Sequence, residues 1–289
     1  MKIAVVDIGS NSIRYMEAEA RDGAVFYSPK QVYTTRLAEG LLESGRLSDG
    51  AMAHSLDVLG RLGETARSGG LPPYAYATNA VRDAENRDAF CGKVTALLGR
   101  RPEVLSGEQE ARYAYLAAAG ARGGFLEIGG GSTQIVSECF CRSFPLGCVK
   151  ARDVCPEETL RKVCIGLKPT LDSVFSDIPA FSTSWTAAGG TATTLAALCL
   201  GLSAYDPAIV QGALLERDAL TACLTRLSDM GDSNRAKLPL LKKRHDVILH
   251  GGSMLLYLMD RLQTDALTVS DTDGMEGYAL SILQKSAAL

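Results

Sequence analysis

The chain has 289 residues, of which 46% are hydrophobic and 22% are charged, and this length exceeds what one hydrophobic core usually serves. The composition therefore excludes a disordered protein and predicts two globular domains. Thirty basic and 33 acidic residues leave a formal net charge of −3, which excludes the broad positive field of a nucleic-acid coat.

The N-terminal segment and the cysteines indicate the cellular compartment of the protein. Only four apolar residues in a row, at positions 3–6, precede Asp7, too few for the core of a secretory signal. No segment reaches the roughly 18 unbroken apolar residues of a membrane-spanning helix. Eight cysteines are too sparse for a disulfide scaffold, so we expect reduced thiols. We therefore expect a cytoplasmic protein that binds neither nucleic acid nor membrane.

The first predicted element is a β-hairpin with a polar tip. Apolar strands at residues 3–6 and 13–16 flank the segment Asp-Ile-Gly-Ser-Asn-Ser at residues 7–12. Taken alone, this segment is explained by a tight turn with a locally satisfied carboxylate. Glycine at position 9 also allows backbone N–H groups to approach an anion, as in a phosphate-binding nest.

Helical signals follow the hairpin. Apolar residues at helical spacing, including Leu56 and Leu59, come after the start signal at residues 48–49 and predict a helix. Further along, Ser106 and Gln109 form a capping box, which places Glu110 in or beside the first turn of the next helix.

Residues 77–82 are a candidate phosphate contact. They combine a strand end with two hydrogen-bonding side chains, Thr78 and Asn79, and with Arg82, whose forked guanidinium suits phosphate oxygens. The alternative is that Arg82 is an exposed residue at the start of a helix.

The hairpin motif occurs a second time after a glycine-rich stretch, residues 120–124, where we expect a hinge. Residues 127–132 read Glu-Ile-Gly-Gly-Gly-Ser, so that the acid, Ile, Gly and Ser recur in register at an offset of 120. Two unrelated turns do not need a carboxylate before the loop and a hydroxyl after it. The repeat therefore predicts two related halves, each with a phosphate loop, facing one site.

Further signals follow in the second half. Gly189, Gly190 and Thr191 form a turn that opens a helix, a common pattern that could contact an anion or a ribose. The basic run at residues 242–245 favours a solvated face over a guide for anionic substrates. An apolar-faced helix at 244–262 and a strand at 267–270 precede a helix at 275–283 that could pack on the first domain. The alternation of strands and helices indicates an α/β protein.

Two phosphate loops, each with a carboxylate behind it, suit phosphoryl transfer. Such a site would hold a polyanion and one divalent cation. The chemistry also needs a group that orients or deprotonates the attacking water. Glu110 is our candidate for this group, although a Glu in a first turn can simply complement the helix dipole.

Together these segments resemble the exopolyphosphatase and guanosine pentaphosphate phosphohydrolase (Ppx/GppA) family. The matching stretches span the chain in the family's order and are DIGSNSIR (7–14), ATNAVRDAEN (77–86), LSGEQEARYAYL (105–116), EIGGGSTQIV (127–136), FPLGCVK (144–150), AAGGTATTLA (187–196) and VSDTDGMEG (269–277). The resemblance implies the short form of an actin-like fold, with two ribonuclease-H-like domains around a central cleft. The domains would be residues 1–120 with 275–289, and residues 121–274.

The resemblance also implies an activity. It is the metal-dependent hydrolysis of a terminal phosphoanhydride bond in polyphosphate or in guanosine penta- or tetraphosphate, with Mg²⁺ or Mn²⁺ as cofactor. A homodimer is implied at the level of the family. Glu110 falls at the catalytic glutamate, and the metal site would use Asp7, Glu127 and Gln134. The implied phosphate contacts are Gly9, Ser10, Asn11, Ser12, Arg14, Thr78, Asn79, Arg82, Gly129, Gly130, Gly131, Ser132 and Thr133.

The chain departs from the family pattern at four positions. Relatives usually carry Asp in place of Glu127, Glu in place of Gln134, and Arg in place of Lys150 and Met275. Because the amide of Gln134 carries no charge and cannot act as a base, metal affinity and activity should fall. Three interpretations stay open: a phosphoanhydride hydrolase, a non-catalytic protein that binds polyphosphate or alarmones, and a phosphotransferase that uses ATP at the turn of Gly189 and Gly190.

Overall fold

The computed structural model describes residues 1–120, 122–242 and 244–287. The chain forms two compact units, Met1–Ala114 with Gly274–Leu289, and Tyr115–Asp273. The predicted domain boundaries lie a few residues from this division, and Ala121, the first residue of the predicted second domain, is outside the described residues. The predicted domain boundaries therefore remain a proposal.

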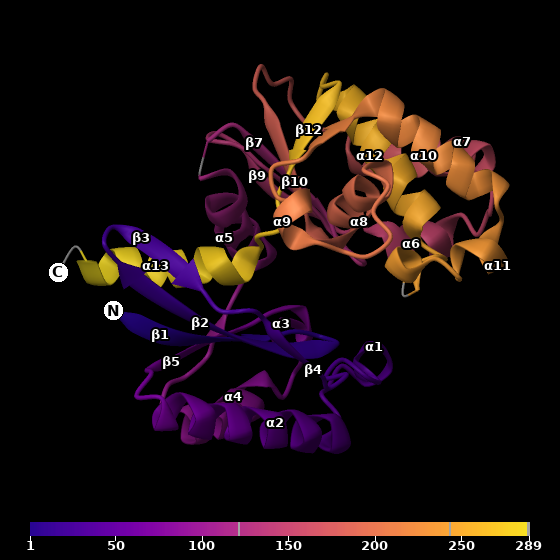
Figure 1. The fold of residues 1–289 in the computed structure, drawn as a ribbon. Coiled ribbons are helices and arrows are strands. Elements are labelled where there is room, and N and C mark those ends of the chain that lie inside the picture. The colour runs from indigo at the N-terminus through magenta and orange to yellow at the C-terminus, as the bar shows by residue number, and fades with distance from the viewer. Residues whose placement is uncertain (121, 243, 288–289) are drawn as a thin grey trace. The chain divides into compact units, whose positions relative to one another are not determined.

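The first unit is a mixed sheet with helices on both faces (Figure 1). Its strands are β1 (Lys2–Ile8), β2 (Ser12–Arg21), β3 (Ala24–Tyr27), β4 (Gln31–Thr34), β5 (Pro73–Ala77) and β6 (Glu103–Val104). Its helices are α1 (Leu41–Ser44), α2 (Asp49–Ser68), α3 (Asn79–Asp83), α4 (Arg87–Leu98), the first part of α5 (Gly107–Ala119), and α13 (Gly274–Ala287).

The sheet order β3-β2-β1-β5-β6 places an antiparallel meander beside parallel strands, and β4 pairs with β2. Strand β1 is buried on both faces because its residues alternate between two cores. Ala4, Val6 and Ile8 pack with α2 and α4, whereas Ile3 and Val5 pack with α13. In Figure 1 the indigo sheet accordingly lies between α2 and α4 on one side and the yellow α13 on the other.

The second unit repeats this plan. Its strands are β7 (Gly124–Ile128), β8 (Thr133–Val136), β9 (Cys141–Phe144), β10 (Trp185–Ala188), β11 (Leu214–Glu216) and β12 (Ala266–Val269). Its helices are α6 (Cys148–Val154), α7 (Leu160–Val174), α8 (Gly189–Cys199), α9 (Pro207–Val210), α10 (Arg217–Asp229), α11 (Asp232–Arg235) and α12 (Ile248–Arg261), with a 3₁₀ turn at Pro239–Leu241.

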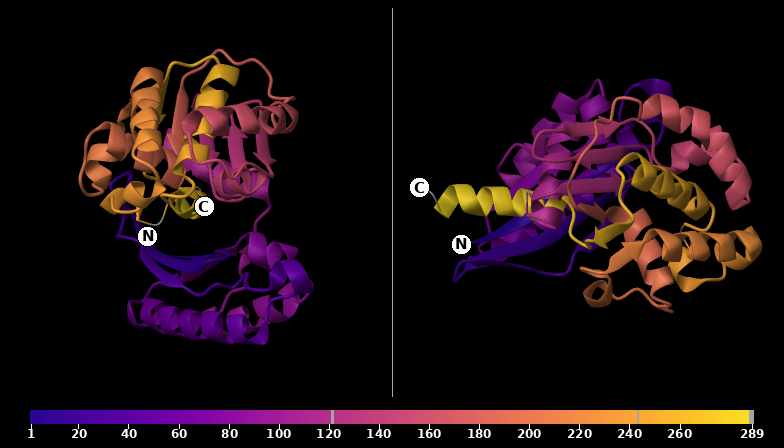
Figure 2. Two further views of the ribbon diagram at one scale, coloured as in Figure 1. Left: turned by 90° about the vertical axis from the view of Figure 1, so that its right-hand side faces the viewer. Right: turned by 90° about the horizontal axis from the view of Figure 1, so that it is seen from above.

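The order β11-β12-β10-β7-β8-β9 again joins an antiparallel meander, β7-β8-β9, to the parallel strands β10 and β12. The largest core of the chain lies in this unit and includes Leu126, Trp185, Leu195 and Leu258. Helix α12 packs against α6, α7, α8 and α10, and the views of Figure 2 show this helical layer from two further sides. The predicted α/β fold with two related sheets of the ribonuclease-H-like type is confirmed.

Several local predictions also hold. Ser48 caps α2, since its side chain accepts the N–H of Ala51 at 3.2 Å. The helix after the last strand packs on β1 and β2 of the first unit. The helix predicted from residue 244 begins only at Ile248, because residues 244–247 form turns.

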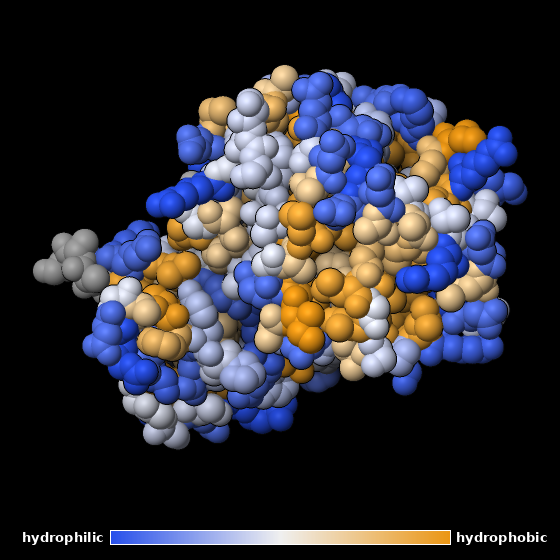
Figure 3. Space-filling view, turned by 45° about the horizontal axis from the view of Figure 1, so that its top comes forward, coloured by the Kyte–Doolittle hydropathy of each residue, from blue (hydrophilic) through white to orange (hydrophobic). Residues whose placement is uncertain are grey.

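The surface is mixed in character. No helix among the described residues is long and apolar enough to cross a membrane. Scattered large apolar side chains reach the surface, among them Val32, Val154 and Ile165. Figure 3 shows hydrophobic areas between hydrophilic residues on one face. Isolated exposed apolar side chains are ordinary for a globular protein.

Candidate active site

The first predicted phosphate loop is a tight connection between β1 and β2. The N–H of Gly9 donates to the carbonyl of Ser12 at 3.1 Å. A Cβ atom on Gly9 would lie 2.9 Å from that same oxygen, so a larger residue does not fit. Gly9 does not adopt a positive φ. The glycine is therefore required by the close approach of two backbone segments and not by a left-handed conformation.

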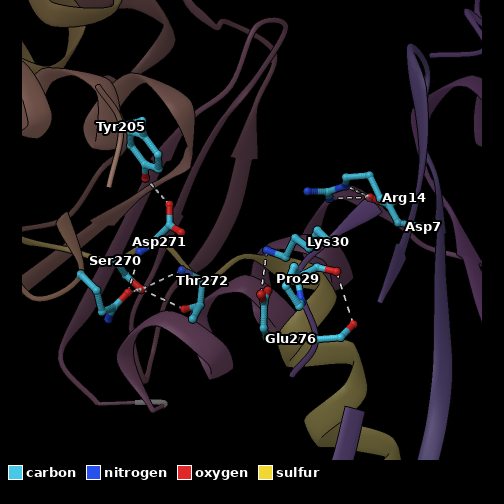
Figure 4. Close-up of polar contacts among 11 residues, drawn as sticks. Asp7, Arg14, Pro29, Lys30, Tyr205, Ser270, Asp271, Thr272 and Glu276 are labelled. Carbon is cyan, nitrogen blue, oxygen red and sulfur yellow. Dashed lines mark hydrogen bonds and ion pairs between the residues drawn. The ribbon is translucent and has the colours of Figure 1, made fainter. Parts of the chain in front are cut away.

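The carboxylate before this loop is held by an arginine on the neighbouring strand. Asp7 and Arg14 are register partners on β1 and β2, and Asp7 is only 4% exposed. The Nε atom of Arg14 donates to Oδ2 of Asp7 at 2.7 Å, and Nη2 donates to the same oxygen (Figure 4). This two-bond contact compensates for the cost of burying the charge.

The structure brings the segment of residues 78–82 to the first loop. The hydroxyl of Ser10 accepts the N–H of Ala80 at 3.2 Å, and the N–H of Thr78 donates to the carbonyl of Ile8 at 3.2 Å. The side chain of Asn79 donates to Asp83 within α3. The predicted contacts at Ser10, Thr78 and Arg82 thus belong to one continuous part of the first unit.

Glu110 lies in the first turn of α5, where the predicted capping box is present. Gln109 donates its N–H to the hydroxyl of Ser106 at 3.1 Å and accepts the N–H of Ser106 at 2.8 Å. The Nη1 atom of Arg82 donates to Oε2 of Glu110 at 3.0 Å and to the carbonyl of Leu105 at 2.7 Å. The side chain of Glu110 therefore has a specific tertiary partner in addition to its place near the helix dipole.

The pKa of Glu110 is raised above the usual glutamate value. Burial is the largest cause, and the nearby Asp7 raises the pKa further. The hydrogen bond and positive charge of Arg82 oppose this shift, as does Arg14. A partly buried carboxylate with a raised pKa accepts a proton more readily than an ordinary glutamate does.

The second loop, between β7 and β8, has the same backbone hydrogen bond as the first. The N–H of Gly129 donates to the carbonyl of Ser132 at 2.9 Å. The carbonyls of Gly129 and Gly130 accept the N–H groups of Cys148 and Val149 at the start of α6. Gly147 makes this contact possible, because a Cβ atom there would overlap the backbone of the loop. Sequence reasoning missed Gly147 because its role depends on a tertiary contact.

The carboxylate of the second loop has a different neighbourhood. Glu127 and Gln134 are register partners on β7 and β8. The Nε2 atom of Gln134 donates to the hydroxyl of Ser132 at 2.9 Å and to that of Ser143 at 3.4 Å. Gly189, at a φ of 77°, packs on the carboxylate, since a Cβ atom there would lie 2.8 Å from Oε1 of Glu127. The predicted Gly189 turn is therefore adjacent to the second loop.

Two predicted contacts use their hydroxyl protons inside the second unit. Thr133 donates to the carbonyl of Leu146 at 2.6 Å, and Thr191 donates to the carbonyl of Ile128 at 3.0 Å. Both residues are buried. These hydroxyl groups hold the loops in place, and a phosphate could receive a hydrogen bond from them only if these bonds broke.

Arg244 belongs to the basic run for which the sequence favoured a solvated face over a guide for anionic substrates. Its guanidinium packs directly on Gly190, where a Cβ atom would overlap it. The expectation of a solvated face at residues 242–245 is wrong for Arg244, which is partly buried, and for His245, which bonds Asp232 at 2.9 Å. Lys243 lies outside the described residues. A short basic run carries no signal for a contact with a distant glycine turn.

The candidate ligands for a cation in the second unit are one carboxylate and one amide oxygen. Among the described residues, no group of three or more His, Cys, Asp or Glu side chains could hold a metal ion. Glu127 and Gln134, however, place a carboxylate and an amide oxygen on paired strands. Mg²⁺ is commonly bound through one or two carboxylates, water and substrate phosphates.

Comparisons with known proteins show the family of the chain. The model of the Ppx/GppA phosphatase family matches residues 19–286. Exopolyphosphatase 2 of Mycobacterium tuberculosis is 30% identical, with 97% of this chain and 98% of the relative covered. Guanosine-5'-triphosphate,3'-diphosphate pyrophosphatase of Vibrio atlanticus is 29% identical, with 98% of this chain but 59% of the relative covered.

A crystal structure of an Aquifex aeolicus member of the Ppx/GppA family superimposes with a TM-score of 0.91 at 28% identity, covering 99% of this chain and 98% of the other. A second structure, titled as the Aquifex aeolicus PPX-GPPA enzyme, gives a TM-score of 0.88 at 30% identity, covering 97% of this chain and 99% of the other. The chain belongs to the Ppx/GppA phosphatase family and is a phosphohydrolase of that type.

Proposed function

We propose that this chain removes the terminal phosphate from polyphosphate or from guanosine pentaphosphate by means of water activated by Glu110. The observation that carries the proposal is the pair formed by Arg82 and Glu110, with Nη1 and Oε2 3.0 Å apart. It unites a carboxylate of raised pKa with an arginine suited to phosphate, in the unit that also holds the first loop.

Each residue has a distinct part in this proposal. Glu110 accepts the proton of the attacking water, and its raised pKa increases the driving force for that transfer. Arg82 keeps the carboxylate oriented through one N–H group and has further N–H groups for phosphate oxygens. Backbone N–H groups and serines of the two loops, Ser10 and Ser132 among them, receive the remaining charge of the substrate.

A divalent cation, Mg²⁺ or Mn²⁺, would be held in the second unit by Glu127 and Gln134, with Asp7 as the candidate carboxylate of the first unit. When bound, it would neutralise charge on the phosphate oxygens. Gln134 would contribute its amide oxygen, because its Nε2 atom donates to Ser132 and Ser143. The side chain of Asp7 bonds Arg14 through Oδ2, so a cation would share this carboxylate with an arginine.

Polyphosphate is the first substrate to test. A relative that is covered over 98% of its own length is named exopolyphosphatase 2. The pyrophosphatase relatives are longer, and the chain covers 59% of their length. Guanosine pentaphosphate is therefore the second substrate to test.

A second candidate function is binding without hydrolysis. The observation that favours it is Gln134, whose neutral amide stands beside Glu127 where relatives usually carry a second acid. Loss of that charge weakens a cation site while the backbone of the phosphate loop is unchanged.

Phosphate release and substrate binding distinguish these functions. We expect free phosphate from long-chain polyphosphate with Mg²⁺ or Mn²⁺, and less from guanosine pentaphosphate. Retained binding of polyphosphate with no phosphate release at any concentration of either cation would establish the binding protein. Transfer of labelled phosphate from ATP to an added acceptor, without release from polyphosphate, would instead establish a phosphotransferase.

A further inference from the structure

Two cysteines meet where α8 ends against α10, away from the residues of the proposed reaction. The described cysteines are all free thiols. Cys199 is the last residue of α8 and is partly exposed, and Cys223 is buried in the middle of α10. The two helices pack against each other.

Backbone geometry brings the two sulfur atoms together. The thiol of Cys199 donates to the carbonyl of Ala219 at 3.7 Å. In an α-helix this carbonyl accepts the N–H of the residue four positions later, which is Cys223. The sulfur of Cys199 therefore lies at the turn of α10 that carries Cys223, close enough for each thiol to shift the pKa of the other.

An arginine completes the environment of Cys223. The Nη2 atom of Arg226 lies 3.8 Å from Sγ of Cys223, one turn along the same helix. The neighbouring thiol of Cys199 and the positive charge of Arg226 lower the pKa of Cys223 to about 7, against burial, which raises it. The pKa of Cys199 is raised, first by the nearby Cys223 and then by burial. Cys199 from α8 and Arg226 from α10 are the titratable or charged groups that act on Cys223 in the described chain.

We propose that Cys199 and Cys223 are a redox modification site that forms a reversible disulfide with hydrogen peroxide as oxidant. The thiolate of Cys223 attacks one peroxide oxygen, the O–O bond breaks, and hydroxide leaves as sulfenic acid forms on Cys223. The sulfur of Cys199 then loses its proton and attacks the sulfur of Cys223. The S–S bond forms as the S–O bond breaks, so that two thiols and one peroxide give one disulfide and two waters.

Four of the other cysteines have different surroundings. Cys139 is exposed, but its sulfur lies 3.8 Å from the hydroxyl of Ser137. Cys164 accepts a hydrogen bond from Ser253, and burial raises the pKa of Cys91 and of Cys148. If exposure alone decided oxidation, Cys139 would react before the buried Cys223.

The disulfide would also attach a helix that is part of the proposed site. Helix α8 begins at Gly189, which packs on Glu127, and ends at Cys199. A covalent bond between its last residue and α10 limits the movement of this helix and constrains the unfolded chain. Oxidation should therefore raise the thermal stability of the protein, and dithiothreitol should reverse the increase.

Limiting hydrogen peroxide, alkylation of the remaining thiols and peptide mass spectrometry test the proposal. The digest must separate Cys164 from Cys199. We expect a peptide that joins Cys199 to Cys223, a loss of two hydrogens in the intact mass, and reversal by dithiothreitol. The cross-link should precede oxidation of Cys139, and its rate should rise with a midpoint near pH 7.

Substitutions at the site test the part of each residue in disulfide formation. Cys199→Ser should leave Cys223 as a sulfenic acid that a dimedone probe traps, and Cys223→Ser should give neither product. Arg226→Gln should slow cross-linking about tenfold, and Arg226→Lys should restore most of the rate, because the cation favours the thiolate. Oxidation of Cys139 before any cross-link, or a folded protein in which peroxide yields no joined peptide, would overturn the proposal.

Discussion

The two loop hairpins share a backbone and differ in charge. Gly9 bonds Ser12 in the first as Gly129 bonds Ser132 in the second, and the lengths are 3.1 and 2.9 Å. At the equivalent register position, however, Asp7 faces Arg14, whereas Glu127 faces Gln134. The first carboxylate is thus neutralised by a guanidinium from its own hairpin. The two hairpins therefore have the same loop geometry, but the residue paired with the carboxylate is charged in the first and neutral in the second.

The neighbouring parallel strand continues this contrast. After β5, the first unit begins α3 with Ala80 donating to Ser10 of the loop. After β10, the second unit begins α8 with Gly189 against the carboxylate of Glu127. In the first unit the helix after the parallel strand therefore contacts the loop through the hydroxyl of Ser10. In the second unit the start of α8 packs on the carboxylate of Glu127.

Arg14→Gln gives the first hairpin the charge pattern of the second and should have the largest effect. It leaves the buried carboxylate of Asp7 without its guanidinium, and we expect a loss of about 3 kcal/mol in the free energy of unfolding. Urea denaturation measures this. Arg21→Gln, at the exposed end of the same strand, is the control and should cost less than about 0.5 kcal/mol. Equal losses in the two variants would show that the Asp7–Arg14 pair does not stabilise the hairpin.

Gly277→Ala tests the support that α13 gives to α5 in the first unit. A Cβ atom at Gly277 would overlap the carbonyl of Tyr113 on α5, one turn beyond Glu110. Although alanine favours a helix, we expect a loss of about 2 kcal/mol from overpacking, together with a lower kcat as α5 shifts. Gly274→Ala is the matched control, because its Cβ atom would lie 3.8 Å from the carbonyl of Glu110, an ordinary contact. A Gly277→Ala protein as stable and active as the control would remove α13 from the support of Glu110.

Opposite charges at position 134 test the second hairpin. Gln134→Glu restores a carboxylate to which Ser132 and Ser143 can donate, and we expect activity to rise and the Mg²⁺ concentration for half-maximal activity to fall, each by roughly tenfold. Gln134→Arg copies the first hairpin and should weaken the response to Mg²⁺. Metal titrations of phosphate release measure both variants. If neither changes the titration, position 134 has no part in cation binding.

The pH dependence of phosphate release gives the smallest expected shift. Glu110 acts as a base only when ionised, so activity should fall as the pH decreases through its raised pKa. Arg82 lowers that pKa through its hydrogen bond and charge, so Arg82→Gln should move the midpoint to higher pH in addition to reducing the rate. A midpoint that stays in place or moves to lower pH in Arg82→Gln would contradict the contact between Arg82 and Glu110.

Local signals in the sequence predicted the parts of the fold that depend on periodicity and turns. The repeat at an offset of 120, the capping box of Ser106 and Gln109, and the cap at Ser48 all recur in the structure because each depends on residues close in the chain.

Those local signals could not predict tertiary contacts. The packing of Arg244 on Gly190 and the place of Gly147 under the second loop join segments far apart in the sequence. Met275, where relatives usually carry arginine, is fully buried with Ile3 and Val5. Thr133 and Thr191 show the same limit, because loop residues that suited phosphate donate their hydroxyls to backbone carbonyls. Which polar groups remain available to a ligand is decided by packing.

The most direct test of the account compares Glu110→Gln with Glu108→Gln, two substitutions in the first turn of α5. Glu108 is exposed, so its replacement removes the same negative charge from the first turn of α5 without altering the contact between Arg82 and Glu110. We predict that Glu110→Gln lowers phosphate release from polyphosphate by at least about 100-fold, the scale of general-base catalysis, while polyphosphate binding is retained. Glu108→Gln should release phosphate at the rate of the unsubstituted protein. Equal rates for the two variants would contradict the assignment of Glu110 as the group that activates water.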